Sequence, residues 1–124
     1  MYNIVFYREA NGHEPVKDYI LSLFAHNDKD SRIKREKIQD YMNILKEHGT
    51  RAGKPFVKHI EGDIWELRPL RDRFMFFTYV GNTIVLLSHF RKTTDKTPKR
   101  EIAKAKKYMK DYKERVVDFE KGKG

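Results

Sequence analysis

The chain has 124 residues, which fits one compact domain, and it has no cysteine, which excludes disulfide staples and thiolate chemistry. Its formal net charge is +9, and residues 91–115 alone hold eleven Lys or Arg against four Asp or Glu, so a polyanion such as RNA or DNA is the expected partner. No apolar run approaches the ~20 residues that span a bilayer, and the first residues lack a signal-peptide pattern, so we expect a cytoplasmic location and no membrane contact.

The first part of the chain is typical of a strand followed by a helical hairpin. Residues 2–7 are rich in aromatic and β-branched side chains, which predicts a strand. Pro15 stands near the start of a helix, whose apolar stripe consists of Val16, Tyr19, Ile20, Leu23 and Phe24. A second helix is predicted over residues 31–48, with Gly49 placed to end it. Its stripe consists of Ile38, Tyr41, Met42 and Leu45.

Four strands and a last helix are expected in the rest of the chain. The predicted strands cover residues 56–60, 64–70, 73–80 and 83–90. The last two are apolar almost throughout, which indicates central strands that are covered on both faces. Thr97 and Pro98 are typical of the N-cap and first residue of a helix with a narrow apolar seam and a basic remainder.

The order of these elements predicts the fold class. Strands in meander order with segregated helices indicate an α+β fold rather than a doubly wound sheet. We expect one domain over residues 1–120 and a disordered tail over residues 121–124.

Several chemistries find no support in the sequence. There is no Gly-rich phosphate loop, no metal-ligand spacing among the five His residues and no Ser in a nucleophile elbow, so we expect neither a metal site nor a cofactor. A cationic cluster remains. Glu66 and Arg68 share one face of a strand, Arg73 begins the next strand across a tight turn, and Lys92 follows the end of the strand after that. Three neighbouring strands would bring these charges to one rim of the sheet.

Such a rim suits RNA cleavage by attack of a 2′-OH on its own neighbouring phosphate. Fixed guanidinium groups stabilise charge on the phosphoryl oxygens without reorganisation, and their planar fork meets two oxygens at once. Nearby cations also lower the pKa of a Lys or His toward values useful in acid–base catalysis. Each residue also has a possible structural role in place of a catalytic one: Arg68 as the partner of Glu66, His89 as a hydrogen-bonded core histidine, and Lys92 as a solvated surface residue.

The run from Ile64 to Lys107, IWELRPLRDRFMFFTYVGNTIVLLSHFRKTTDKTPKREIAKAKK, resembles the phage-derived, HigB-type toxins of the RelE/ParE superfamily. The resemblance rests on an aromatic-Glu-Leu-Arg strand, an Arg-aromatic strand, an apolar strand ending in Phe-x-Lys, and a Thr-Pro step before a Glu-Ile helix. It implies a RelE-like fold, with an antiparallel-dominated sheet, an N-terminal helical hairpin on one face and a C-terminal helix.

The same resemblance implies an activity and its partners. The activity is that of a toxin–antitoxin toxin, a ribosome-dependent endoribonuclease that cuts mRNA without a metal and leaves a cyclic phosphate. The partners are mRNA on the ribosome and a HigA-like helix-turn-helix antitoxin, through which alone the toxin would reach operator DNA.

The resemblance also implies roles for individual residues, which we assign to this chain by their position in the matching sequence. Arg68 and Arg73 match the phosphate-stabilising arginines of these toxins, and Lys92 matches a lysine that binds RNA or assists proton transfer. This chain has Glu66 where RelE has a lysine, and His89-Phe90 where the family often has Gly-Phe. Glu66, Lys92 and His89 are therefore alternative candidates for the general base. The residues expected to contact RNA are Lys54, Lys58, Arg71, Phe90, Arg91 and Lys96.

Two other functions fit the same fold. One is a ParE-like inhibitor of DNA gyrase, which would need no cationic catalytic rim. The other is a non-catalytic module that binds nucleic acid or an antitoxin.

Overall fold

The computed structural model describes the backbone of residues 1–123 and the side chains of residues 1–117. The elements are β1 (Asn3–Phe6), α1 (Pro15–Ser22), the 3-10 turn η1 (Leu23–Ala25), α2 (Lys29–His48), the 3-10 turn η2 (Gly49–Ala52), β2 (Val57–Glu61), β3 (Ile64–Leu67), β4 (Asp72–Tyr79), β5 (Thr83–Arg91) and α3 (Lys99–Lys123). This is the predicted α+β order, and it fits a RelE-like fold.

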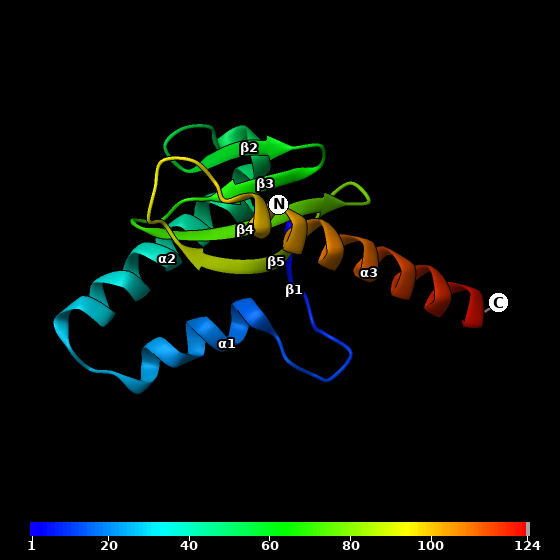
Figure 1. Ribbon diagram of the computed structural model, residues 1–124, viewed down its shortest axis with the longest axis horizontal. Helices are drawn as coiled ribbons and strands as arrows, with labels where there is room; N and C mark the ends of the chain where they lie inside the picture. The colour runs from blue at the N-terminus through cyan, green and yellow to red at the C-terminus, as the bar shows by residue number, and fades with distance from the viewer. Residues whose placement is uncertain (124) are drawn as a thin grey trace.

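All five strands form one sheet in the order β1-β5-β4-β3-β2 (Figure 1). The pairs β2–β3, β3–β4 and β4–β5 are antiparallel, as the meander order predicts. β1 instead lies parallel to β5 at one edge, with Asn3 opposite Thr83. The sheet is thus mostly antiparallel but mixed. Two helices and three further strands separate β1 from β5 along the chain, and a connection of this length allows the two strands to pair in parallel.

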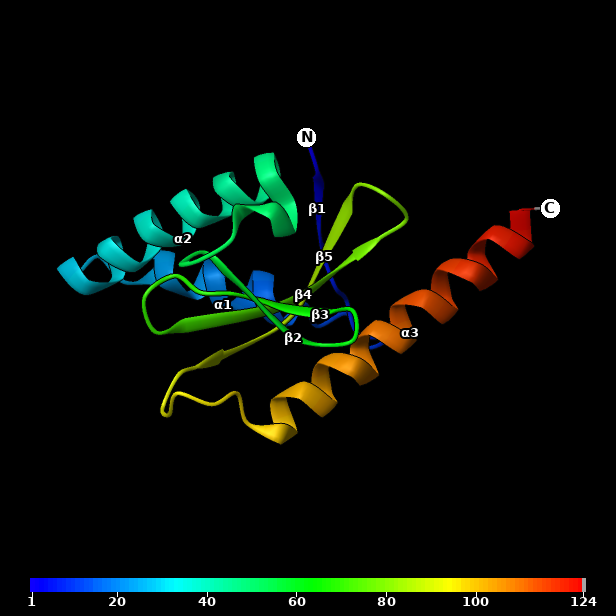
Figure 2. The same cartoon turned by 90° about the horizontal axis from the view of Figure 1, so that it is seen from above.

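Helices cover both faces of the sheet. Figure 2 shows α1 and α2 on one side of the strands and α3 on the other. One buried cluster joins Val16, Ile38 and Leu45 to the face with Phe74 and Phe76, and a second packs Ala105 against the other face. The apolar runs of β4 and β5 are therefore covered on both sides, which confirms the prediction for these two strands.

The helical hairpin follows the predicted stripes except at one end. α2 ends at His48, and Gly49 takes a positive φ of 59°, a conformation that glycine adopts without steric cost. The stripe of the first helix was expected to bury Phe24, but α1 stops at Ser22 and a 3-10 turn follows. The tighter turn changes the helical period, so Phe24 points outward and is 66% exposed.

The last helix begins one residue later than expected. α3 starts at Lys99, and the hydroxyl of Thr97 donates to Glu66 on β3 instead of capping the helix. Its predicted seam packs on the sheet through Ile102, Ala105 and Met109, and the helix then extends beyond the strands (Figures 1 and 2). In the part of the chain that the structure describes, none of the helices combines the length and the apolar character that a membrane span requires.

The disordered tail expected over residues 121–124 stays a prediction. The side chains of residues 118–124, Phe119 of the seam among them, lie outside the described part of the chain, as does all of Gly124.

Candidate functional site

One end of the sheet carries three of the predicted site residues on its α3 face. Glu66 on β3 lies opposite Met75 on β4, whose side chain packs beneath α3, so Glu66 points to that face. Arg68 follows Glu66 by two residues and Arg73 precedes Met75 by two, so the pleat directs both toward the same face. The structure brings Glu66, Arg68 and Arg73 together, as the spacing predicts.

These three residues and Thr97 form a buried polar group that we call the Glu66 cluster. The Nε atoms of Arg68 and Arg73 lie 3.3 and 3.6 Å from Oε1 of Glu66. The hydroxyl of Thr97 donates to Oε2 at 3.0 Å. Glu66 is only 2% exposed. Two guanidinium groups thus share one buried carboxylate, which leaves the cluster with a net positive charge.

Arg73 is the inner cation of the cluster. Its Nη1 donates to the backbone carbonyls of Leu70 and Asp72 at 2.8 and 2.9 Å, and its side chain is only 7% exposed. Burial, and then the charge of Arg68, lower the pKa of Arg73 from its ordinary value, which lies far above neutrality. Arg73 therefore holds the turn between β3 and β4 in place while contributing charge beneath the surface.

Arg68 is the outer cation of the cluster. Its side chain is 24% exposed, against 7% for Arg73. Its Nε is buried, and within the described residues it makes no hydrogen bond with acceptable geometry, although the carboxylate of Glu66 lies beside it. Arg68 is thus the arginine of this cluster that an anion from solvent can reach.

Lys92 lies at the same end of the sheet but in a separate hollow. Its backbone N–H donates to the carbonyl of Arg71 at 2.7 Å, which places it beside the β3–β4 turn. Its Nζ lies 3.2 Å from Oδ1 of the exposed Asp95. An open hollow of about 550 Å³ is lined by Lys92, Asp95, Leu70 and Arg71, among others. The predicted third cation thus adjoins the turn without entering the Glu66 cluster.

His89 lies on the opposite face of the sheet from the Glu66 cluster. It pairs with Phe74, which points toward α1 and α2, and its ring stacks on Tyr19 with a centroid distance of 3.6 Å. Its Nε2 lies 2.9 Å from Oδ1 of Asp72, which also accepts a hydrogen bond from the Tyr19 hydroxyl at 2.8 Å. His89, one of the three candidates for the general base, thus lies across the sheet from Arg73, because residues 89 and 90 point to opposite sides of a strand. Its part in catalysis stays a prediction.

Asp72 is buried at the centre of this second polar group. Burial alone would raise the pKa of Asp72, but hydrogen bonds from His89 and Tyr19 favour the carboxylate and leave its pKa below the ordinary value. Burial, together with the hydrogen bond to Asp72, raises the pKa of Tyr19. Asp72 therefore stabilises the fold as a carboxylate.

This lowered pKa predicts a pH dependence of stability. A depressed carboxyl pKa contributes stability above the unfolded value of ~3.9, and this contribution is lost as the pH falls through the folded value. Asp72→Asn is therefore expected to lower the free energy of unfolding at pH 6, with the deficit shrinking from about pH 4 downward. Urea unfolding of both proteins between pH 6 and pH 2.5 checks this. A deficit that does not change with pH would contradict it.

The residues expected to contact RNA are spread around this end and beyond it. Lys58 on β2 lies opposite Glu66 and so shares its face, and Phe90 is half-buried against α3. Arg71 and Arg91 are exposed near the β3–β4 turn.

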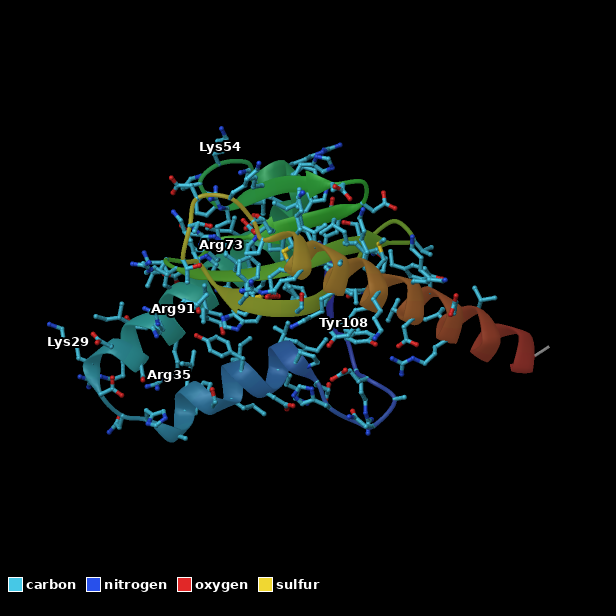
Figure 3. The ribbon with its side chains drawn as sticks, in the orientation of Figure 1. Lys29, Arg35, Lys54, Arg73, Arg91 and Tyr108 are labelled. Carbon is cyan, nitrogen blue, oxygen red and sulfur yellow. The ribbon has the colours of Figure 1, made fainter. Side chains whose placement is uncertain are left out.

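Lys54 points away from the body of the molecule, apart from Arg73 (Figure 3). Lys96 is exposed in the loop before α3. Geometry thus favours Lys58 over Lys54 as a neighbour of the cluster, whereas Arg91 lies on the α2 side of the sheet, with Lys34.

Three partners of the predicted site were not foreseen from the sequence. Thr97 reaches Glu66 from a loop 31 residues away, and Tyr19 reaches Asp72 from α1 across 53 residues. Asp72 itself is typical of a turn residue in the sequence. No local pattern signals such contacts, because they depend on how the loop and α1 lie on the sheet.

Among the described residues, no group of three or more His, Asp or Glu side chains is arranged to hold a metal ion. The sequence profile of the family described as "Phage derived protein Gp49-like (DUF891)" matches residues 27–110, from the start of α2 into α3. The match covers more than half of the chain and includes both polar groups of the site except Tyr19. No curated protein matches the chain.

Proposed function

Because the chain belongs to the Gp49-like family of phage-derived proteins, which is associated with the toxins of toxin–antitoxin systems, we propose that it is an mRNA-cleaving toxin of the HigB/RelE type. The observation that carries the proposal is the Glu66 cluster. Two arginines from neighbouring strands share one carboxylate, and the outer one is accessible to an anion.

The proposed reaction is attack of a ribose 2′-OH on its own 3′ phosphate. A bond forms from the 2′ oxygen to phosphorus while the 2′ proton passes to solvent water. The bond to the 5′ oxygen breaks and that oxygen takes up a proton, which leaves a 2′,3′-cyclic phosphate and a 5′-hydroxyl end. Negative charge grows on the phosphoryl oxygens in the transition state. Arg68 contacts these oxygens, since its guanidinium is partly exposed and is held beside the buried carboxylate of Glu66 by opposite charge.

Arg73 and Glu66 act as positioning residues in this mechanism. Glu66 is buried and its oxygens already contact Arg68, Arg73 and Thr97, which suits orientation of Arg68 better than removal of a proton. Lys92, an ammonium in an open hollow beside the turn, supplies the proton that the leaving 5′ oxygen requires.

The partners follow from charge and family. A net charge of +9 favours mRNA bound at the ribosome as the substrate. An antitoxin partner is expected for a toxin of this kind, and we propose the HigA-like, helix-turn-helix class. Operator DNA is then contacted through the antitoxin, and the toxin acts in the cytoplasm.

Expression of the chain in a bacterium tests the proposal. We expect growth arrest, with new mRNA 5′-hydroxyl ends inside coding regions that disappear when translation is blocked before induction. Sequencing of these ends in both conditions is the measurement. Arrest with intact mRNA and DNA damage would favour the gyrase inhibitor, and the absence of arrest would favour the non-catalytic module.

A further inference from the structure

We propose that the turn between β3 and β4, residues 68–72, is a ridge that binds single-stranded RNA, with a backbone phosphate held in a second basic hollow on the α2 side. Leu70 and Arg71 form the crest of this RNA-binding ridge. The proposal rests on the proposed function only for the identity of the natural RNA, since binding requires no cleavage.

Three elements contribute cations to the second hollow. Its volume is about 450 Å³, and Lys34 of α2, Arg71 of the turn and Arg91 at the end of β5 line it. Figure 3 shows Arg91 beside α2, at the sheet end that also holds Arg73. Positive charge converging from a helix, a turn and a strand suits a phosphate group, which accepts hydrogen bonds from several directions.

The acids beside these cations offset only part of their charge, because two carboxylates face three cations in the hollow. Asp30 and Asp72 also line the hollow, yet Lys34, Arg71 and Arg91 form no ion pair within the described residues. The carboxylate of Asp72 is already engaged by His89 and Tyr19. The hollow therefore keeps positive charge for a ligand from outside.

The two hollows meet at the ridge. Leu70 and Arg71 line both the hollow with Lys34 and the hollow with Lys92. The guanidinium of Arg71 donates to the carbonyl of Lys92 at 3.3 Å, so it stands between them. A single-stranded RNA that crosses the ridge would meet cations on each side of it, with one phosphate near Lys92 and another near Lys34.

Leu70 gives the ridge an apolar crest. It is 47% exposed, and its φ of 57° lies in the left-handed region that non-glycine residues rarely adopt. Arg73 holds the carbonyl of Leu70 at 2.8 Å, which keeps this conformation in place. Strained residues of this kind concentrate at ligand clamps, and an exposed apolar side chain between cations suits the face of an unstacked base.

Binding of an uncleavable RNA tests the ridge. The probe is a fluorescent, fully 2′-O-methylated RNA of about eight nucleotides, and the readout is anisotropy with the full chain. We expect Lys34→Ala and Arg91→Ala each to weaken binding by about fivefold, equivalent to roughly 1 kcal/mol. We also expect the dependence of log affinity on log salt to lose about 0.7 from its slope for each phosphate contact removed.

Lys46→Ala is the matched control, because it removes the same charge from the exposed far end of the same helix. It is expected to leave affinity within about twofold of wild type. Equal losses in Lys34→Ala and Lys46→Ala would overturn the proposal, because they would indicate general attraction by charge. The absence of RNA binding by the wild type would also overturn it.

Leu70→Gly separates the ridge from folding. Glycine adopts the left-handed conformation freely, so this variant is expected to unfold at the same or a higher temperature and yet bind the probe more weakly. Unchanged affinity would remove Leu70 from the site. Retained probe binding by a chain that cleaves no mRNA would overturn the proposed enzyme and leave the ridge intact, whereas cleavage with wild-type affinity in Lys34→Ala would overturn the ridge alone.

Discussion

Arg68→Ala is expected to lower mRNA cleavage by about 10²–10³-fold, the usual effect of losing one fixed donor to a charged transition state. Arg68 is the accessible cation of the Glu66 cluster, and its removal leaves Glu66 with Arg73 and Thr97 as partners. The fold should therefore persist. The number of new mRNA 5′ ends per cell after induction, at matched protein level, is the measurement.

Two further variants sharpen this prediction. Arg68→Lys keeps the charge but loses the planar fork, so it should retain only part of the activity. Arg32→Ala, on the exposed surface of α2, removes an arginine elsewhere and should cleave as the wild type does. Wild-type cleavage and toxicity in Arg68→Ala, at equal protein level, would rule out the Glu66 cluster as the active centre.

The fold was predictable because its signals are local. The helical stripes of α1 and α2 and the apolar runs of β4 and β5 predict which faces are covered, and two buried clusters confirm this. The place of β1 was not predictable in the same way. Its pairing with β5 joins residues 80 positions apart, and nothing in residues 2–7 specifies a parallel partner.

The candidate site was predictable only where strand periodicity decides it. A spacing of two residues places Glu66 and Arg68 on one face, and the tight turn to β4 brings Arg73 beside them. The same period separates His89 from Phe90, but the face of His89 follows only from the register with β4, which includes an irregularity between Met75 and Phe76. A pattern within one strand does not contain that register.

Burial of the charges was the least predictable property. Arg73 is typical of a surface cation at the start of a strand, whereas its guanidinium is enclosed by the turn that it holds. The contact from Thr97 depends on the path of the loop before α3. In Arg73→Ala, loss of activity should therefore come with loss of stability, because Glu66 and two carbonyls lose a partner.

Glu66→Gln is expected to cause the largest loss of stability, about 3 kcal/mol or more in the free energy of unfolding. Glu66 is 2% exposed, and without its charge the buried guanidinium of Arg73 faces Arg68 with no counter-ion between them. Urea unfolding at neutral pH is the measurement, with a fall in the melting temperature of roughly 10 °C expected beside it. A change of less than ~1 kcal/mol would show that the carboxylate is not required by the buried arginine.

A double-mutant cycle separates the charge pair from the cavity. Glu66→Leu alone should destabilise the fold as Glu66→Gln does. Arg73→Met alone should also destabilise it, because it leaves Glu66 buried with only Arg68 and Thr97. Glu66→Leu combined with Arg73→Met removes both buried charges, so the double variant should be more stable than the sum of the single losses predicts. If the losses in the free energy of unfolding were instead additive, each side chain would stabilise the fold through its own packing and not through the charge pair. The double variant should still lack cleavage, because Arg68 would then be folded in place but no longer oriented by Glu66.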